Sequence, residues 1–477
     1  MQIEEISIFH KRTIKDSLSA IDKHGLGVLF IIDQDAKLIG IVTDGDIRRS
    51  LIGGFTLESA VAEIMNSNYV ALPLTATNSE ILERLNSRIK MIPLIDESGV
   101  LKDYASIQRL RRIDIASPSL SGNEISYVTE CISTNWISSQ GPFVRRFEKN
   151  FEKYHGRSAL AVSNGTVALH LALLSLGIGE GDEVIVPNLT FAASINSVIH
   201  AGATPVIVDV EEDTWNIDPN EVRKVISPKT KAIMVVHLYG YPVRMKEICD
   251  IKEEHGLLLI EDCAEALGSR YHGLPMGTFG DISTFSFFGN KTITTGEGGM
   301  MIFKNDEVAD DARVLRDHGM NPQKRYWHDV VGYNYRLTNI QAAIGVAQFE
   351  RLEEIVERKR EIAQKYIDLL LNYPEAVMVL EQPGFHSSYW MFSFYIKENE
   401  RVNRDGLIKF LAERSIETRP LFYPLNIMPP YQAIKRGGEL PVSKYISERG
   451  LSLPSSVTLI NDEIDYVCNC IEEYFAL

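Results

Sequence analysis

The sequence is short of cysteine and of basic charge. Its 477 residues include only five cysteines and no C-x-x-C pair; the cysteines are Cys131, Cys249, Cys263, Cys468 and Cys470. An odd number without metal-ligand spacing predicts neither structural disulfides nor a metal site. Asp and Glu number 64 against 49 Lys and Arg, giving a formal net charge of -15. A general affinity for nucleic acid or for anionic membranes is therefore not expected.

Long apolar runs are also missing. No stretch approaches the roughly 20 apolar residues that span a bilayer, and the first residues, MQIEEISIFHKR, are acidic where a secretory signal would be basic and then apolar. We therefore expect a cytoplasmic protein. What is present is the composition of an ordinary globular chain, 45% hydrophobic and 24% charged. At roughly 100 to 200 residues per domain, the length predicts two to four domains.

The first 110 residues contain an internal repeat. FIIDQDAKLIGIVT, residues 30–43, aligns with PLIDESGVLKDYAS, residues 93–106, at an offset of 63, and a helical pattern precedes each copy. Each copy therefore predicts a helix, a strand, a turn and a second strand. The repeat resembles a CBS-domain pair, a regulatory module that in its family binds adenine nucleotides between the two copies.

Within that resemblance, one copy matches the pattern that implies nucleotide binding. Gly40, Thr43 and Asp46 stand at the matching positions of the first copy. In the second copy Ser106 is followed three residues later by Arg109 where an aspartate is expected, so at most one good site is predicted. The alternative is that Thr43 and Asp46 serve only to cap the following helix. The sequence leaves both interpretations open.

The segment RRIDIASPSLSGNE, residues 111–124, contains a Pro, a Gly and several Ser and predicts a domain boundary. We expect a regulatory pair at 1–110, a linker at 111–122, a large domain at 123–355 and a small α+β domain at 356–477. In the large domain, the apolar runs SALAVS, DEVIVP, TPVIVDV, KAIMVVH and GLLLIED alternate with helix-length segments. This alternation predicts an α/β fold with a mostly parallel sheet covered by helices. In such sheets ligands bind beyond the carboxyl ends of the strands.

Two polar features directly follow predicted strands of the large domain. Asn164, Gly165 and Thr166 follow SALAVS and open a helix, whose first N–H groups suit a phosphate, although N-G-T is also a common turn and cap. Asp262 ends the apolar run of GLLLIED. A buried carboxylate there needs a partner, so it either caps the next segment or holds a protonated ring nitrogen.

Two further features lie in loops. Lys291 stands in FSFFGNKTITTGEGGM among apolar and glycine residues, where desolvation makes an amine a nucleophile; a surface lysine is the alternative. Ser286, five residues earlier, is placed to donate to a phosphate, and Asn334 lies in the polar stretch GYNYRLTNIQAA. A lysine for an aldehyde, a carboxylate for a ring nitrogen and an anion site together match the needs of pyridoxal 5'-phosphate.

Residues 112–477 resemble the sugar aminotransferases of the DegT/DnrJ/EryC1/StrS family, which are fold type I pyridoxal phosphate enzymes and typically homodimers. The resemblance rests on SNGTVALHLAL, GDEVIVPNLTFAAS, HLYG, IEDCAEALGS, FSFFGNKTITTGEGGM and GYNYRLTNIQAA. It implies that Lys291 is the catalytic lysine, which forms the Schiff base and carries the proton. It also implies that Asp262 pairs with the pyridine nitrogen and that the ring of Phe191 stacks on the cofactor.

The same resemblance implies the remaining cofactor contacts. Gly165, Thr166 and Ser286 correspond to phosphate ligands, with Asn164 beside them, and Asn334 corresponds to a residue given to the phosphate by the other subunit. Glu265 stands where most of the family has glutamine, near the phenolic oxygen of the cofactor. Shared active sites would make the dimer necessary for activity.

Four motifs resemble one subgroup of that family. They are SFFGNKTITTGEGGM, RYWHDVVGYNYRLTN, SLSGNEISYVTECISTNWISSQG and LFYPLNIMPPY. The subgroup transfers an amino group from glutamate to C4 of GDP-4-keto-6-deoxymannose, giving GDP-perosamine for surface polysaccharide. Residues in these motifs are expected to line the sugar-nucleotide site, although each aromatic ring could equally be packing: Trp136, Ser138, Tyr326, His328 and Tyr423.

Three alternatives remain at this point. A UDP-linked 4-keto sugar could replace the GDP-linked one. The chain could also be a sensor that binds a nucleotide and the cofactor without catalysis. A related 3-dehydratase branch has a histidine at the position of the lysine, so the presence of Lys291 argues against that branch.

Overall fold

The structure is a computed structural model that describes residues 3–74, 76, 78–86, 88–106, 113–399 and 401–476. It divides into two compact units, Met1–Arg112 and Ile113–Leu477, which are described separately. Arg109, on which the expected weakness of the second copy depends, lies outside the described residues.

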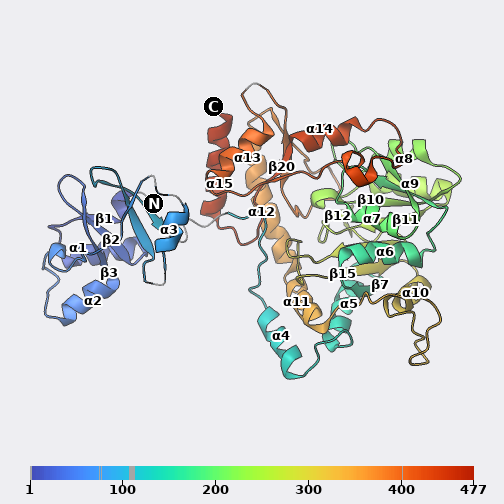
Figure 1. Cartoon of the computed structure of the whole chain (residues 1–477), viewed down its shortest axis with the longest axis horizontal. Coiled ribbons are helices and arrows are strands. Elements are labelled where there is room, and N and C mark those ends of the chain that lie inside the picture. The colour runs from blue at the N-terminus through green and yellow to red at the C-terminus, as the bar shows by residue number, and fades with distance from the viewer. Residues whose placement is uncertain are drawn as a thin grey trace. The chain divides into compact units, whose positions relative to one another are not determined.

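The first unit contains two copies of the same arrangement, and the strands β1, β2 and β3 of the first copy are labelled in Figure 1. β2 (Val28–Ile32) pairs antiparallel with β3 (Leu38–Thr43), and β5 (Met91–Ile95) pairs in the same way with β6 (Leu101–Ser106). The bounds of the second pair are those of the first shifted by 63 residues, and both pairs carry a register shift at the equivalent place. The internal repeat predicted from the sequence is therefore confirmed.

A short parallel strand completes each of these sheets. β1 (Ser7–Phe9) pairs with β2, and β4 (Leu72–Pro73) pairs with β5. The helices of this unit are η1 (Ile3–Glu5), α1 (Ile14–His24), α2 (Asp44–Ile52), η2 (Val61–Glu63) and α3 (Asn78–Arg84). α1 begins at a capping box and buries one apolar face against the first sheet.

The second unit is built on a seven-stranded sheet of order β7-β15-β14-β11-β10-β8-β9. Every strand in it is parallel to the others except β15, which is antiparallel to both neighbours. The predicted mostly parallel sheet is confirmed. The strands are β7 (Ser158–Val162), β8 (Glu183–Pro187), β9 (Thr204–Val208), β10 (Thr230–Val236), β11 (Leu258–Asp262), β14 (Ile282–Ser286) and β15 (Gly299–Phe303).

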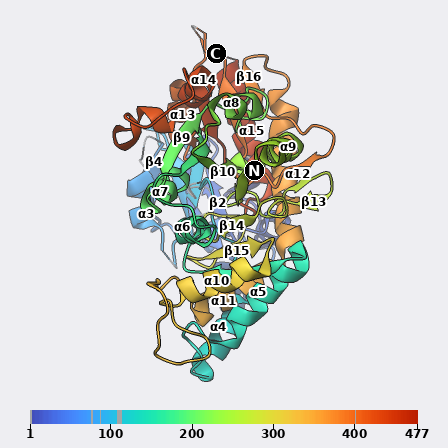
Figure 2. The same cartoon turned by 90° about the vertical axis from the view of Figure 1, so that its right-hand side faces the viewer.

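Both faces of this sheet are covered, which explains why its strands are apolar without interruption. Along β8, Ile185 belongs to the core on one face, and its neighbours Val184 and Val186 belong to the core on the other. Figure 2 shows α4, α5 and α11 together at one end of this unit. The helices around the sheet are α4 (Glu124–Ser133), α5 (Pro142–His155), α6 (Gly165–Ser175), α7 (Ala193–His200), α8 (Pro219–Val225), α9 (Met245–His255), α10 (Asp306–Arg316) and α11 (Asn339–Phe349).

The long helix α12 (Leu352–Leu370) leads into an α+β region with its own core. A four-stranded sheet of order β16-β18-β20-β19 forms there, and a smaller sheet has the order β13-β12-β17. The strands are β12 (Arg270–Tyr271), β13 (Leu274–Pro275), β16 (Ala376–Met378), β17 (Phe385–His386), β18 (Ser393–Ile396), β19 (Arg419–Pro420) and β20 (Gly450–Ser452). The remaining helices are η3 (Leu238–Gly240), α13 (Arg404–Ala412), η4 (Leu425–Ile427), η5 (Pro429–Tyr431), α14 (Pro441–Arg449) and α15 (Asn461–Phe475). None of the helices in the described part of the chain combines the length and the apolar character that a membrane span requires.

Candidate active site

One edge of the seven-stranded sheet gathers predicted site residues that are far apart in the sequence. Because β7, β8, β11 and β14 are parallel, their carboxyl ends meet at this edge. Asn164 follows β7, Phe191 follows β8, Asp262 ends β11 and Ser286 ends β14. The sequence prediction that chemistry lies just after these strands has its physical basis in this arrangement.

The start of α6 forms an anion-binding surface together with β14. The side-chain oxygen of Asn164 caps the helix by accepting the N–H of Val167 at 3.0 Å. The N–H groups of Gly165 and Thr166, in the first turn, have no acceptor within the helix. Gly165 lies directly against Ser286, because a Cβ atom on Gly165 would come within 2.7 Å of the Ser286 Cβ atom. Helix N–H groups and a hydroxyl thus point to one place, which suits a phosphate.

Asp262 is a buried carboxylate whose described donors are neutral. Its Oδ2 accepts the hydroxyl of Ser194 at 2.9 Å and its Oδ1 accepts the N–H of Ala264 at 3.1 Å, while only 5% of the residue is exposed. Burial raises the pKa of Asp262. Among the described residues no lysine or arginine forms an ion pair with it. The carboxylate is therefore suited to a cationic N–H donor supplied from outside the chain.

Lys291 lies in an irregular segment, and its side chain is 13% exposed, so the alternative of a surface lysine is wrong. Its Nζ atom is 3.6 Å from the Glu265 Oε1 atom and 3.9 Å from the centroid of the Trp390 ring. The other oxygen of Glu265 accepts the N–H of Tyr239 at 2.7 Å. The amine is thus held between a carboxylate and an aromatic face.

Glu265 is the clearest titrating group of this site. Burial raises its pKa to about 7, against the opposing charge of Lys291. Because the folded state binds this proton more tightly than the unfolded state, its stabilising contribution is complete below a pH of about 4.5. It is lost as the pH rises through about 7. Over that window the loss amounts to roughly 3 kcal/mol of unfolding free energy.

We predict that Glu265→Gln removes this pH dependence, because glutamine does not titrate. The melting temperature of the variant minus that of the wild type should increase as the pH rises from 5 to 8. Differential scanning calorimetry across this range measures the difference. Glu361→Gln, which removes an exposed carboxylate of α12, is the matched control and should give a flat difference. A flat difference for Glu265→Gln would contradict the assignment.

The structure leaves Phe191 and Asn334 at the surface of the chain. Phe191 is 59% exposed, and its ring is tilted by 53° relative to the ring of Phe422, with 5.9 Å between the centroids. Asn334 is exposed in the loop before α11, where its side-chain oxygen accepts the Arg336 Nε–H at 3.2 Å. Among the described residues no contact joins Asn334 to Lys291, and its role at the site of another subunit stays a prediction.

The predicted sugar-nucleotide residues lie in three separate loops of the second unit. Trp136, Tyr326 and Tyr423 are 51%, 75% and 56% exposed, so none of these rings is core packing within the chain. Ser138 and His328 are also exposed. The Ser138 carbonyl accepts the N–H of Asn339 at 3.0 Å, and a ring nitrogen of His328 lies 2.8 Å from the carbonyl of His318. A shared role of the five residues in binding the sugar nucleotide stays a prediction.

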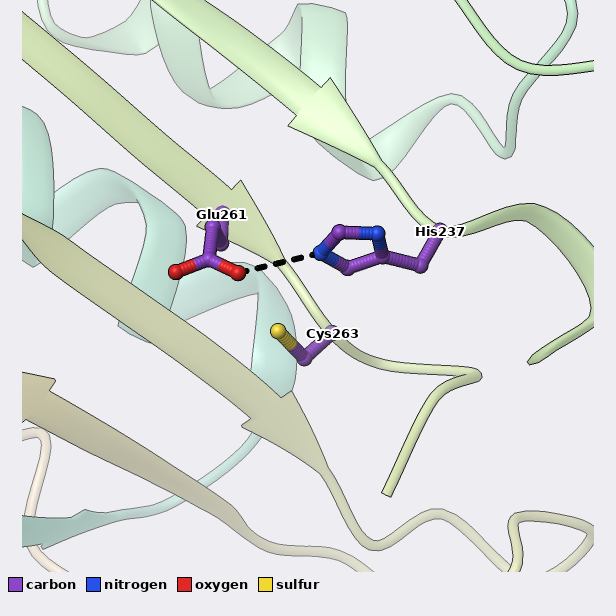
Figure 3. Close-up of side chains that lie close together, drawn as sticks. All are labelled: His237, Glu261 and Cys263. Carbon is purple, nitrogen blue, oxygen red and sulfur yellow. Dashed lines mark hydrogen bonds and ion pairs between the residues drawn. The ribbon is translucent and has the colours of Figure 1, made fainter. Parts of the chain in front are cut away.

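A buried cluster beside Asp262 braces the strand ends. His237, Glu261 and Cys263 lie within reach of one another (Figure 3), with potential ligand atoms within 4.8 Å. Glu261 already accepts the His237 Nε2–H at 3.1 Å and three N–H groups of residues 277–280, and these hydrogen bonds hold its pKa low despite burial. The other ring nitrogen of His237 accepts the N–H of Val243. With these lone pairs in use, the cluster fixes the backbone around Asp262.

Sequence reasoning missed three residues of the site. Ser194 donates to Asp262, Tyr239 donates its N–H to Glu265, and Trp390 covers Lys291. Ser194 and Tyr239 stand inside motifs that were recognised as family-like. Trp390 lies 99 positions after Lys291, and its only sequence signal is that tryptophan is rare, with four in the chain.

In the first unit, Thr43 and Asp46 form the helix cap that was the alternative to nucleotide binding. The Thr43 Oγ1 atom accepts the N–H of Asp46 at 3.2 Å, and the Asp46 carboxylate accepts the N–H of Thr43 at 3.0 Å. Asp46 also pairs with Arg49 at 2.6 Å. Gly40 packs against Met65, where a Cβ atom would approach the sulfur to 2.6 Å. A role of Thr43 and Asp46 in nucleotide binding stays a prediction.

A mostly parallel sheet with a largely enclosed lysine, a buried aspartate and a helix N-terminus at its carboxyl edge matches the requirements of an aminotransferase site. The family model described as the DegT/DnrJ/EryC1/StrS aminotransferase family matches residues 118–472, and the chain belongs to that family. A CBS-domain model matches residues 1–53 and 61–114, which confirms the N-terminal CBS pair.

Relatives and solved structures agree with this assignment. The chain is 47% identical to the GDP-perosamine synthase of Vibrio cholerae over 364 residues, which is 76% of this chain and 99% of that protein. It is also 47% identical to the GDP-perosamine synthase of Escherichia coli O157:H7, over 77% of this chain and 100% of that protein. The aminotransferase TlmJ from Streptoalloteichus hindustanus superposes with a TM-score of 0.72 at 31% identity, covering 76% of this chain and 98% of TlmJ.

Proposed function

We propose that this chain transfers an amino group from glutamate to C4 of GDP-4-keto-6-deoxymannose, giving GDP-perosamine. The observation that carries the reaction class is the buried Lys291 at the same sheet edge as the buried Asp262 and the start of α6. The substrate is supported by 47% identity to two GDP-perosamine synthases over nearly their whole length.

The residues at this edge fit pyridoxal 5'-phosphate. Asp262, whose described donors are neutral, would hold a protonated ring nitrogen. The N–H groups of Gly165 and Thr166 and the hydroxyl of Ser286 would hold the phosphate, and the exposed ring of Phe191 offers a stacking face. When bound, this cofactor supplies an aldehyde that carries the amino group and a ring that accepts electrons.

The chain's own groups then have distinct roles. The Nζ atom of Lys291 accepts and returns the proton of the reacting carbon, as a general base and general acid. The Glu265 carboxylate, 3.6 Å away, holds that amine, and with burial bringing its pKa to about 7 it can exchange a proton near neutral pH. Asp262 stays fixed by Ser194 and by the N–H of Ala264. Asp262 and Glu265 are buried and the Lys291 side chain is only 13% exposed, which limits the access of water to the proton transfer.

A substrate screen tests the proposed function. Purified protein with pyridoxal phosphate and glutamate is offered GDP- and UDP-linked 4-keto-6-deoxy sugars, while 2-oxoglutarate and the amino sugar are followed. Selective turnover of the GDP-linked sugar is expected. Turnover of only a UDP-linked sugar would keep the chemistry and reject the substrate. Bound cofactor without any turnover would favour the alternative of a non-catalytic sensor.

We also propose a homodimer with shared active sites. Apolar side chains stay exposed on and after α4, including Ile125 at 79%, Ile132 at 60% and Ile137 at 51%. Asn334 is exposed, as a residue given to a partner's site would be. We predict that mixing inactive Lys291→Ala and Asn334→Ala proteins restores part of the activity, up to about one quarter, because hybrid dimers contain one intact site. No recovery after subunit exchange, verified by mass, would reject shared sites.

For the CBS pair we propose nucleotide control of the transferase, with a tethering or assembly role as the alternative. The GDP-perosamine synthases align with about three quarters of this chain over 99–100% of their own length, so a chain without residues 1–110 is expected to fold. We predict that this deletion removes the effect of adenine nucleotides on the rate while keeping basal turnover. Calorimetric titration of the full chain measures binding. Unchanged kinetics and no binding would reject regulation.

A further inference from the structure

Trp390 makes two separate contacts with the segment that carries Lys291. The face of its ring lies 3.9 Å from the Lys291 Nζ atom, measured to the ring centroid. Its Nε1–H donates to the carbonyl of Asn290 at 2.7 Å, one residue before the lysine. One buried side chain, 3% exposed, therefore contacts both the amine and the backbone that carries it.

The contacts of Trp390 matter for the segment around Lys291 because this segment has no regular structure and borders a small cavity. Residues 289–292 have no helix or strand structure. They border a cavity of about 20 Å³, which Lys359 also lines. The cavity is a local gap in the packing on that side of the segment, so the hydrogen bonds of the segment contribute to where the lysine points.

The orientation of the Trp390 ring is fixed in turn. The ring is nearly parallel to that of Tyr239, with 7° between the planes and 6.1 Å between centroids. Tyr239 stacks at 20° on Phe422 and donates its N–H to Glu265, the other partner of Lys291. The aromatic stack and the carboxylate thus hold Lys291 from two directions.

Lys359 of α12 fixes the backbone of Trp390. Its Nζ atom donates to the Trp390 carbonyl at 3.0 Å and to the Ser455 carbonyl at 2.8 Å. Burial lowers the pKa of Lys359 to about 8, and among the described residues no carboxylate pairs with it. This ammonium is bound by two carbonyl groups, so it ties the backbone at Trp390 to the backbone at Ser455.

We propose that Trp390 is a positioning residue for Lys291, and that Lys359 fixes Trp390 in that place. The indole ring holds the lysine amine toward Asp262 and Glu265, and its N–H sets the backbone at Asn290. This inference rests on the proposed function, because it concerns the reach of Lys291 toward the cofactor.

The test compares Trp390→Leu and Trp390→Phe with Trp215→Leu in the full chain. Trp215 is a matched control, because it is 3% exposed and belongs to the same hydrophobic cluster but contacts Tyr395 instead of Lys291. The first measurement needs no cofactor: reductive methylation of Lys291 with formaldehyde and cyanoborohydride, followed by peptide mass spectrometry. Trp390→Leu should speed labelling of Lys291 about tenfold, since cover and cation–π attraction are both lost. Trp215→Leu should leave it unchanged.

The second measurement uses pyridoxal phosphate as the probe. Trp390→Leu should reduce the circular dichroism signal per bound cofactor and lower kcat about tenfold or more, with KM for the sugar nucleotide within about twofold. Trp390→Phe, which keeps a ring and loses the N–H, should lie between it and the wild type. Lys359→Met should shift the same signals in the same direction, whereas Lys365→Met, at an exposed ion pair of the same helix, should not.

The outcomes separate the proposed function of the chain from the proposed positioning role of Trp390. A wild-type chain that captures no cofactor rejects the proposed function, while the labelling result still tests the contact with Trp390. Wild-type labelling and dichroism in Trp390→Leu, or effects equal to those of Trp215→Leu, would overturn the inference. If Trp390→Leu does not fold, wild-type values for Trp390→Phe in labelling, dichroism and kcat would do the same.

Discussion

Replacement of Lys291 by alanine is expected to lower kcat by about 10⁴-fold or more while the protein stays folded. A positioned proton donor and acceptor contributes about 10² to 10⁴ by itself, and in the proposed function the lysine would also supply the nucleophile for the cofactor's aldehyde. No other lysine of the described residues lies within contact of Glu265. Single-turnover conversion of the keto sugar, followed by chromatography of the amino sugar, measures the loss.

The fold should survive this change for a structural reason. Lys291 makes one ion pair and one contact with an aromatic ring, in a segment without regular structure, so few contacts of the core depend on it. The melting temperature is expected to change by only a few degrees. Turnover above about one percent of wild type in a correctly folded Lys291→Ala protein would end the assignment of this lysine.

Replacement of Asp262 by asparagine should lower kcat about 100- to 1,000-fold, the second largest effect that we expect. Asparagine keeps the size and an oxygen that accepts the hydroxyl of Ser194, but it cannot neutralise a cationic N–H donor. In a buried site the loss of one member of a charge pair has a large cost. The rate should not recover at any pH, because the missing charge is not restored by titration.

Two controls make this prediction specific. Asp281→Asn removes another partly buried carboxylate of the same sheet region, paired with Lys252, and should reduce stability with little change in kcat. Ser194→Ala removes one hydrogen bond of Asp262 and should cost about tenfold. If Asp281→Asn lowers kcat as much as Asp262→Asn, the effect of the latter would be structural and its role in the site would be wrong.

Local sequence patterns were sufficient to predict the architecture. Uninterrupted apolar runs predicted strands buried on both faces, and alternate residues of β8 do point into two different cores. The offset of 63 residues reappears in the strand bounds of the first unit. Residues that follow a strand were predictable as site residues for the same reason, because parallel strands bring their carboxyl ends to one edge.

Contacts between segments that are distant in sequence could not be predicted and became visible only in the fold. The choice between cap and ligand at Thr43 depends on where two side chains point, and the pattern of residues is the same for both. Trp390 reaches Lys291 because the segment before β18, bound by Lys359 of α12, contacts the irregular segment after β14, which is far from it in sequence.

The sequence by itself determined the order of strands and helices, the repeat and the polar residues at the strand ends, because periodicity records burial along a single element. Only the tertiary structure decided which side chains surround Lys291. The segment 289–295 has no period to read, and its neighbours Glu265, Trp390 and Lys359 come from three other parts of the chain. Which side chains lie next to Lys291 depends on packing in three dimensions, and the local spacing of residues in the sequence does not encode that packing.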